Sequence, residues 1–261
     1  MPVIDTNGQR VSYTDSGRGM AVVFVPGIVG SRDWFCYQSA GLSDHYRVIT
    51  YDLRKARGGV NYSLQLLTDD LARFLTAIHV HVAVIAGYSF GGLIAMRFAA
   101  IHPDRCLALV LASTTPRFPD LVSDELLSHL VPGGVAPRGF FARLKRRLFG
   151  PKEADADDSD PLTALRPSVA ELDRATLDAR LGIVRETDMT PALGELSAPA
   201  LVMAGSRERS YVLSGSQTLD QEIQDSTLEV IEDSDSYYFY TRHDVFNSIV
   251  EDYLSHKIAR L

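Results

Sequence analysis

Six short apolar runs, separated by longer amphipathic stretches, constrain the fold of this chain most strongly. Continuous apolar runs are typical of strands that are buried on both faces of a sheet. The alternation with helical patterns predicts an α/β fold, with a mostly parallel, doubly wound sheet and helices on both faces. The apolar runs cover residues 21–27, 46–52, 82–87, 106–113, 200–205 and 227–233, and the helical patterns cover residues 63–78, 90–101, 214–224 and 244–259.

One long section interrupts this alternation. Between Pro116 and about Leu196 the sequence has no strand-like run, and it contains helical patterns around an acidic stretch at residues 151–161. We therefore expect a helical lid at residues 116–196, inserted into a core that is formed by residues 1–115 and 197–261. The chain of 261 residues, 46% of them hydrophobic, is long enough for one large globular unit with such an insertion.

Charge and cysteine content exclude several classes of function. The formal net charge is −7, so we expect a small-molecule or peptide substrate and neither nucleic acid nor a membrane as partner. Cys36 and Cys106 form no metal-ligand pattern, so we expect free thiols and no metal or other cofactor. The sequence shows no secretory leader and no run long enough to span a bilayer, which favours a cytoplasmic protein. It does not indicate the oligomeric state.

A serine lies at a tight junction between a predicted strand and a predicted helix. Residues 87–91 read Gly-Tyr-Ser-Phe-Gly, between the apolar run and a helix-forming stretch. Glycines at both ends of this pentapeptide permit a turn that is too tight for a Cβ atom, and the turn projects Ser89 from the carboxyl end of the strand. We therefore predict that Ser89 stands at the nucleophile position of a G-x-S-x-G elbow, where it either attacks the substrate or only hydrogen-bonds to it.

The elbow and its surroundings resemble the α/β-hydrolase superfamily over nearly the whole chain. The stretch "VVFVPGIVGSRDWF" is similar to the family's first strand and oxyanion loop, "VITYDLR" to the next strand, "HPDRCLALVLAS" to the segment before the lid, and "LSAPALVMAGSRE" to the strand before the acid. The resemblance implies the α/β-hydrolase fold with a lid. It also implies an oxyanion hole formed by the backbone N–H groups of Ile28 and Phe90.

The other two positions of the family's catalytic triad depart from its pattern. Glu208 stands where the family has an aspartate, although the adjacent Arg207 and Arg209 equally fit a surface ion-pair cluster. An ungapped comparison with the family's last catalytic motif places Ser236 at the histidine position. A serine hydroxyl cannot act as a base near pH 7, because its pKa lies far above that of imidazole. The sequence therefore predicts a degraded triad.

Two other histidines are candidates for the missing base. His129 lies in the expected lid and His243 at the expected start of the last helix, but both also fit ordinary helix positions. The aromatic stretch after Ser236 either lines a substrate pocket or packs a corner between a strand and a helix. The candidate substrate-binding residues are Val29, Trp34, Tyr88, Tyr237 and Tyr238.

The absence of an imidazole at position 236 determines the functional expectation. General acid–base catalysis contributes about 10²–10⁴-fold, so efficient ester hydrolysis is not expected. The leading hypothesis is an atypical enzyme of a biosynthetic, natural-product-like pathway, which stabilises the oxyanion or enolate of a small or peptidic carbonyl compound during epimerisation, elimination or cyclisation. A second hypothesis is a serine hydrolase of carboxylic esters or thioesters, with Ser89 as nucleophile and His129 or His243 as base. A third is a ligand-binding or partner protein without catalytic activity.

Overall fold

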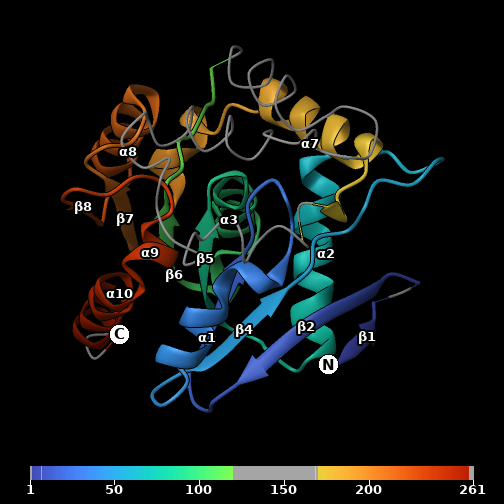
Figure 1. Ribbon diagram of the computed structural model, residues 1–261, viewed down its shortest axis with the longest axis horizontal. Helices are drawn as coiled ribbons and strands as arrows, with labels where there is room; N and C mark the ends of the chain where they lie inside the picture. Colours follow the sequence, from blue (N-terminus) through green and yellow to red (C-terminus); the bar gives the residue numbers. More distant parts are fainter. Residues whose placement is uncertain (1, 7, 120–167, 169, 259–261) are drawn as a thin grey trace.

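The computed structural model describes residues 2–6, 8–119, 168 and 170–258 (Figure 1). The described residues form an eight-stranded sheet with the order β1-β2-β4-β3-β5-β6-β7-β8. β2 pairs antiparallel with β1 and with β4, and the other neighbouring strands pair in parallel. The strands are β1 (Val3–Asp5), β2 (Arg10–Ser16), β3 (Ala21–Val25), β4 (Arg47–Tyr51), β5 (Ala83–Tyr88), β6 (Cys106–Ala112), β7 (Ala200–Gly205) and β8 (Ser226–Ile231).

Helices cover both faces of the sheet. α2, α3 and α8 pack on one face, and α1, α9 and α10 pack on the other (Figure 1). The main helices are α1 (Cys36–Gly41), α2 (Leu64–Ala77), α3 (Phe90–Ile101), α7 (Arg174–Glu186), α8 (Ser210–Glu222), α9 (Tyr238–Thr241) and α10 (His243–Ile258), and short 3₁₀ helices cover Arg32–Phe35, Pro103–Arg105 and Thr190–Glu195. The predicted α/β-hydrolase fold with a mostly parallel sheet is therefore confirmed.

The strand β3 shows why the central runs are continuously apolar. Val23 and Val25 point into the core beneath α2 and α3, whereas Val22 and Phe24 point into the core beneath α1 and α10. All four side chains are at most 1% exposed. A strand with helices on both faces has no solvent-facing side, so alternation of polar and apolar residues disappears.

The two N-terminal strands were not predicted, because their sequence signal is different. β2 mixes buried, half-buried and exposed positions, and β1 is short and mostly exposed. Both lie at the antiparallel edge of the sheet, where one face is partly open to solvent. Continuous apolar runs do not identify such strands.

The predicted lid lies mostly outside the described residues, and its boundaries stay a prediction. Its described C-terminal part includes α7, which begins after Asp173, whose carboxylate accepts a hydrogen bond of 2.8 Å from the Thr176 backbone N–H. α7 lies near the N-terminal end of α2 (Figure 1). The Thr176 hydroxyl accepts a hydrogen bond of 2.9 Å from the Ala56 N–H, which ties α7 to the loop that follows β4.

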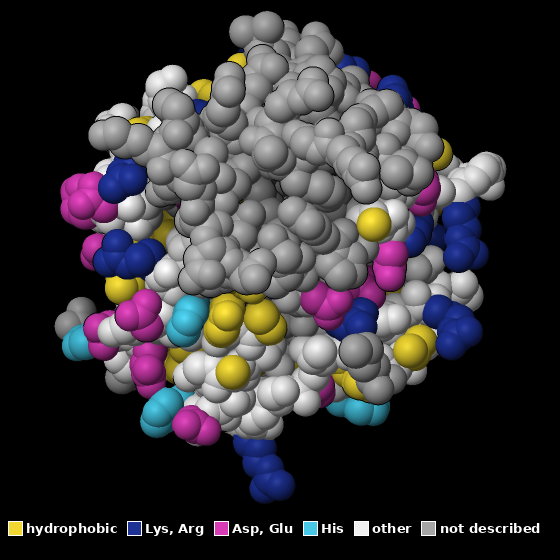
Figure 2. Space-filling view, in the orientation of Figure 1, with side chains coloured by type: hydrophobic (Ala, Val, Ile, Leu, Met, Phe, Trp, Pro, Cys, Tyr) yellow, Lys and Arg dark blue, Asp and Glu magenta, His cyan; other side chains and the backbone are white. Residues whose placement is uncertain are grey.

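Surface charge, helix hydrophobicity and the two cysteines can each be compared with what the composition predicts. On the face shown in Figure 2, acidic and basic side chains are interspersed around the rim. None of the helices that the structure describes combines the length and the apolar character needed to cross a membrane. Cys36 and Cys106 are both free thiols, as predicted, and burial raises the pKa of the Cys106 thiol to about 12.

Candidate active site

The elbow holds Ser89 in a strained backbone conformation between β5 and α3. Its φ is 51° and its ψ is −118°, a region that residues other than glycine rarely adopt and that costs about 1–3 kcal/mol. The surrounding backbone fixes it there: the Ser89 N–H donates to Ala112 O at 2.9 Å, and its carbonyl accepts from the Gly92 N–H and from the Thr114 hydroxyl, both at 2.8 Å. Such strain is retained where it serves the position of a side chain.

The glycines of the elbow permit close contact between backbones. A Cβ atom on Gly87 would lie 2.6 Å from Gly91 O, and a Cβ atom on Gly91 would lie 2.2 Å from Val25 O. Neither neighbouring atom is the end of a flexible side chain, so any larger residue would force the backbones apart. The turn of the elbow itself therefore requires the first glycine, and the contact with the end of β3 requires the second.

Because of this contact, the segments that carry the two predicted oxyanion donors lie next to each other. Phe90 is the first residue of α3, and Ile28 follows the end of β3. The loop around Ile28 is closed by a hydrogen bond of 2.9 Å from the Gly30 N–H to Gly27 O. The Leu53 N–H in turn donates to Gly30 O at 2.9 Å, which fixes the loop to the end of β4.

Glu208 is a buried carboxylate at the end of β7, with 8% of its surface exposed. One oxygen, Oε1, accepts from the Ser113 hydroxyl at 2.6 Å and from the Gly205 N–H at 3.1 Å. The other, Oε2, accepts from the Ser236 hydroxyl at 3.0 Å. Burial raises the pKa of Glu208 above its ordinary value, although these three hydrogen bonds act in the opposite direction.

Arg207 forms a surface ion pair, as one of the two alternatives expected, but Glu208 does not take part in it. The Arg207 guanidinium pairs with the exposed carboxylate of Asp233 at 3.0 Å. Glu208 points in the other direction, toward the hydroxyls of Ser113, which follows β6, and Ser236, which follows β8.

The loop after β8 carries Ser236 to this carboxylate. The Arg207 N–H donates to Ser234 O at 2.8 Å, and a Cβ atom on Gly205 would lie 2.3 Å from the same oxygen. This close packing fixes the loop against the turn that holds Glu208. Ser236 therefore lies beside the Glu208 carboxylate.

Of the two candidate histidines, His243 lies within the described residues. His243 begins α10, and its ring stacks on Tyr37 with centroids 4.1 Å apart and planes inclined by 9°. Among the described residues, no hydrogen bond joins His243 to Ser89 or Glu208. His129 lies outside the described residues.

Three of the predicted substrate-binding residues lie together beside the elbow. Trp34 packs against Tyr88 with ring centroids 6.3 Å apart and against Tyr237 with centroids 6.0 Å apart. Val29 packs against the same core cluster. Tyr237 and Val29 are half-buried, whereas Trp34 and Tyr88 are 6% exposed.

Tyr238 has a structural environment that differs from its predicted one. Its side chain is fully buried, and its hydroxyl donates to Met203 O at 2.8 Å. The hydroxyl is thus used within the core and does not face a pocket. For this residue the alternative of a packed corner between a strand and a helix is the correct one.

Two residues at the site were not identified from the sequence. Ser113 directly follows β6, which pairs with the elbow strand, and a serine at the carboxyl end of a central parallel strand was a usable signal. Arg180 lies on α7 and is 1% exposed, and its side chain donates to Ile28 O at 2.7 Å. An arginine in an amphipathic helix ordinarily indicates a solvent-facing position, so no sequence signal identifies this one.

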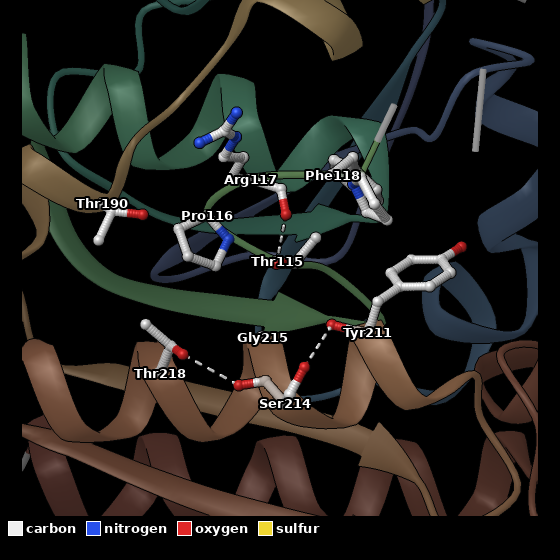
Figure 3. A pocket seen from close by; sticks show the side chains of 10 residues that line it. Thr115, Pro116, Arg117, Phe118, Thr190, Tyr211, Ser214, Gly215 and Thr218 are labelled. Carbon is white, nitrogen blue, oxygen red and sulfur yellow. Dashed lines mark hydrogen bonds between the residues drawn. The ribbon is translucent and has the colours of Figure 1, made fainter. Parts of the chain in front are cut away.

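A cavity of about 480 Å³ lies between the segment that follows β6 and the helix α8 (Figure 3). Thr115 lines the cavity, and the preceding residue, Thr114, donates its hydroxyl to Ser89 O. Its other lining residues are Pro116, Arg117, Phe118, Pro119, Thr190, Tyr211, Ser214, Gly215 and Thr218. None of the five predicted substrate-binding residues is part of this described lining.

Comparisons with known proteins establish the family. The family model for the alpha/beta hydrolase fold matches residues 20–242, so the chain belongs to this family. A pimeloyl-[acyl-carrier protein] methyl ester esterase of Aeromonas hydrophila is 27% identical over 232 residues, which cover 82% of this chain and 87% of that protein. A 3-oxoadipate enol-lactonase 2 of Acinetobacter baylyi is 26% identical over 219 residues, which cover 82% and 81%. The crystal structure of a hydrolase from Pseudomonas aeruginosa has a TM-score of 0.84 at 22% identity and 97% coverage of both chains.

These relatives contradict the leading functional hypothesis. They are named as an esterase and a lactonase, so hydrolysis is favoured over the predicted epimerisation, elimination or cyclisation. The prediction of a non-hydrolytic enzyme was wrong. It relied on the missing imidazole alone and gave too little weight to the elbow and the buried acid, which the described structure retains.

Proposed function

We propose that this protein is a serine hydrolase that cleaves a carboxylic ester, thioester or lactone through an acyl-enzyme formed on Ser89. The observation that carries the proposal is the strained backbone of Ser89 at φ 51°, held by three hydrogen bonds at the carboxyl edge of the sheet. The similarity to an esterase and an enol-lactonase supports the reaction class. Comparing ester hydrolysis by the wild type and by Ser89→Ala tests the proposal.

The reaction begins when the Ser89 oxygen attacks the substrate carbonyl carbon. The carbonyl π electrons move to the oxygen, and the backbone N–H groups of Phe90 and Ile28 stabilise the resulting oxyanion. An oxyanion-hole donor is worth about 10²–10³-fold in kcat. Collapse of the tetrahedral intermediate breaks the bond to the leaving oxygen or sulfur, which takes up the proton that Ser89 gave up. Water then adds to the acyl carbon and gives a proton to the same acceptor, and that proton returns to the Ser89 oxygen as the acid product leaves.

We place the final acceptor of the Ser89 proton at Glu208. The Ser236 hydroxyl donates to Glu208, so it transfers its own proton to the carboxylate as its oxygen receives the proton from Ser89, directly or through water. Ser236 is then a relay and not the terminal base, which its high pKa excludes. The raised pKa of Glu208 makes this carboxylate a stronger base than an ordinary one.

Alanine substitutions distinguish the relay through Ser236 and Glu208 from a mechanism in which a histidine elsewhere in the chain is the base. We expect Ser236→Ala to lower kcat by about 10-fold to 10²-fold, because proton transfer to Glu208 is interrupted. His243→Ala is expected to change kcat by less than about twofold, since its ring is stacked on Tyr37. The measurement is kcat for 4-nitrophenyl butyrate, with His129→Ala assayed in parallel. A large loss in His129→Ala together with normal activity in Ser236→Ala would assign the base to the histidine.

The pH dependence of activity provides an independent prediction. Glu208 accepts the proton only when it is ionised, and burial raises its pKa above the ordinary value. On acidification, kcat is therefore expected to fall at a higher pH than an ordinary glutamate would give, and to rise to a plateau above that pH. Glu208→Gln should lose most of its activity, and the fall of kcat on acidification should disappear, because glutamine does not titrate. Glu208→Asp keeps a carboxylate, so its kcat should still fall at acidic pH. An acidic limb that persists unchanged in Glu208→Gln would show that another group titrates.

A further inference from the structure

Arg180 is a charged side chain in the protein interior that the proposed chemistry has not yet used. It projects from α7 and is 1% exposed. Among the described residues it forms no ion pair with a carboxylate. Its N–H groups donate instead to uncharged carbonyl and hydroxyl oxygens. Burying a guanidinium is unfavourable unless its hydrogen bonds are satisfied, so this arrangement indicates a specific role.

The guanidinium joins three segments that are distant in the sequence. One nitrogen, Nη1, donates to Ile28 O at 2.7 Å, and Nη2 donates to Arg54 O at 3.0 Å. Nε donates to the Tyr62 hydroxyl at 3.0 Å, and that hydroxyl in turn donates to Arg54 O at 2.7 Å. The planar fork of an arginine side chain fits several fixed acceptors at once, which the single ammonium of lysine cannot reproduce.

The shape of the oxyanion loop is adapted to this guanidinium. Gly30 has φ +73°, and a Cβ atom on it would lie 2.4 Å from Nη1 and 2.7 Å from Cζ of Arg180. Only glycine therefore allows the loop to lie against the guanidinium. Together with the hydrogen bond from Gly30 N–H to Gly27 O, the contact at Ile28 O restrains the loop from both of its sides.

We infer that Arg180 is a positioning residue for the oxyanion hole: by holding Ile28 O, it fixes the orientation of the loop that presents the Ile28 N–H to the substrate. This inference rests on the proposed hydrolase function. The Ile28 N–H lies in the same peptide plane as Gly27 O, which accepts from the Gly30 N–H at 2.9 Å, and Ile28 O lies in the next peptide plane. Arg180 holds this second plane, so both peptide planes that flank Ile28 are restrained and the N–H keeps its direction. Because Arg180 lies on α7, it also connects the described C-terminal part of the predicted lid to the catalytic edge.

Arg180→Met tests the inference because it keeps the unbranched apolar part of the side chain and removes every donor. We expect kcat for 4-nitrophenyl butyrate to fall by about 10²-fold, as for loss of an oxyanion donor, and KM to change by less than about threefold. The inhibition constant of an alkyl trifluoromethyl ketone, which forms an oxyanionic adduct with the serine, should rise by a similar factor to the fall in kcat. Arg180→Lys should recover part of the lost activity.

The control is Arg174→Met on the same helix. Arg174 is exposed and pairs with Asp178 one turn away, so its substitution should leave kcat and the inhibition constant unchanged. Thermal unfolding of each variant identifies any that fails to fold. Should Arg180→Met be unfolded, Tyr62→Phe keeps the arginine but removes the acceptor of Nε, and it should lower kcat several-fold with KM unchanged.

The outcomes separate this inference from the proposed function. If Ser89→Ala is inactive while folded Arg180→Met and Tyr62→Phe keep the wild-type kcat and inhibition constant, the positioning role is wrong and the hydrolase proposal stands. If Ser89→Ala keeps the wild-type activity, the hydrolase proposal fails regardless of the Arg180 variants. Equal losses in kcat and in substrate affinity would indicate general disruption of the site and would also overturn the positioning role.

Discussion

Ser236→His is expected to raise the rate of ester hydrolysis by about 10²-fold or more. The Ser236 hydroxyl already donates to Glu208 at 3.0 Å, so a ring at this position has a buried carboxylate available to orient it. An imidazole has a pKa near the operating pH and accepts the Ser89 proton directly, whereas the serine relay does not. The measurement is kcat/KM for 4-nitrophenyl butyrate in the wild type and in Ser236→His.

The double variant Glu208→Gln/Ser236→His is the matched control for this gain. Without the carboxylate, the ring loses the partner that sets its tautomer and stabilises its charged form, so most of the gain should disappear. The wild type and the single Glu208→Gln variant complete a mutant cycle that measures the coupling between the two positions. An unchanged or lower rate in folded Ser236→His would show that position 236 does not face Ser89 in the way proposed.

Ser89→Ala is expected to lower hydrolysis by about 10³-fold or more, close to the background rate, because no acyl-enzyme can form. The variant removes one oxygen and keeps the Cβ atom, so the backbone contacts of the elbow are retained. Folding is not expected to account for the loss, since the hydrogen bonds that hold residue 89 involve its N–H and C=O groups. The measurement is kcat together with the unfolding temperature.

Ser89→Gly serves as a second control for the same prediction. This variant also lacks the hydroxyl and should be as inactive as Ser89→Ala. Glycine adopts φ values near +50° without strain, so its unfolding temperature should be at least as high as that of Ser89→Ala. Activity in either variant above about one tenth of the wild type would show that hydrolysis does not use Ser89 as nucleophile.

The central fold could be predicted because buried parallel strands leave a strong pattern in the sequence. Every apolar run that was identified corresponds to one of β3 to β8, and the elbow was recognisable from five consecutive residues. The edge strands β1 and β2 were missed because partly exposed antiparallel strands lack continuous apolar runs. The pattern therefore depends on burial on both faces and not on strand formation itself.

The catalytic edge was only partly predictable, for a different physical reason. Glu208 and Ser236 could be selected because the resemblance predicts triad positions for both, and the structure brings their side chains together. Tyr238 was misjudged, since an aromatic residue beside a catalytic position packs into the core as readily as into a pocket. Arg180 could not be found, because its role depends on three carbonyl and hydroxyl groups that only the folded chain assembles.

The function was misjudged from one departure in the family pattern. The missing histidine led to the expectation of a non-hydrolytic reaction, which the named relatives contradict. The site contains a buried carboxylate and a serine with a strained backbone, and the proposed acyl transfer uses both. A single substitution in a triad therefore carries less information than the geometry of the groups that remain.

The most direct test of Ser89 as nucleophile is the intact mass of the protein after reaction with a fluorophosphonate. The account predicts one adduct per chain in the wild type, located at Ser89 by peptide mapping, and none in Ser89→Ala. It also predicts that the adduct forms faster in Ser236→His. A wild-type protein that remains unmodified while it hydrolyses esters, or an adduct on another residue, would contradict the account.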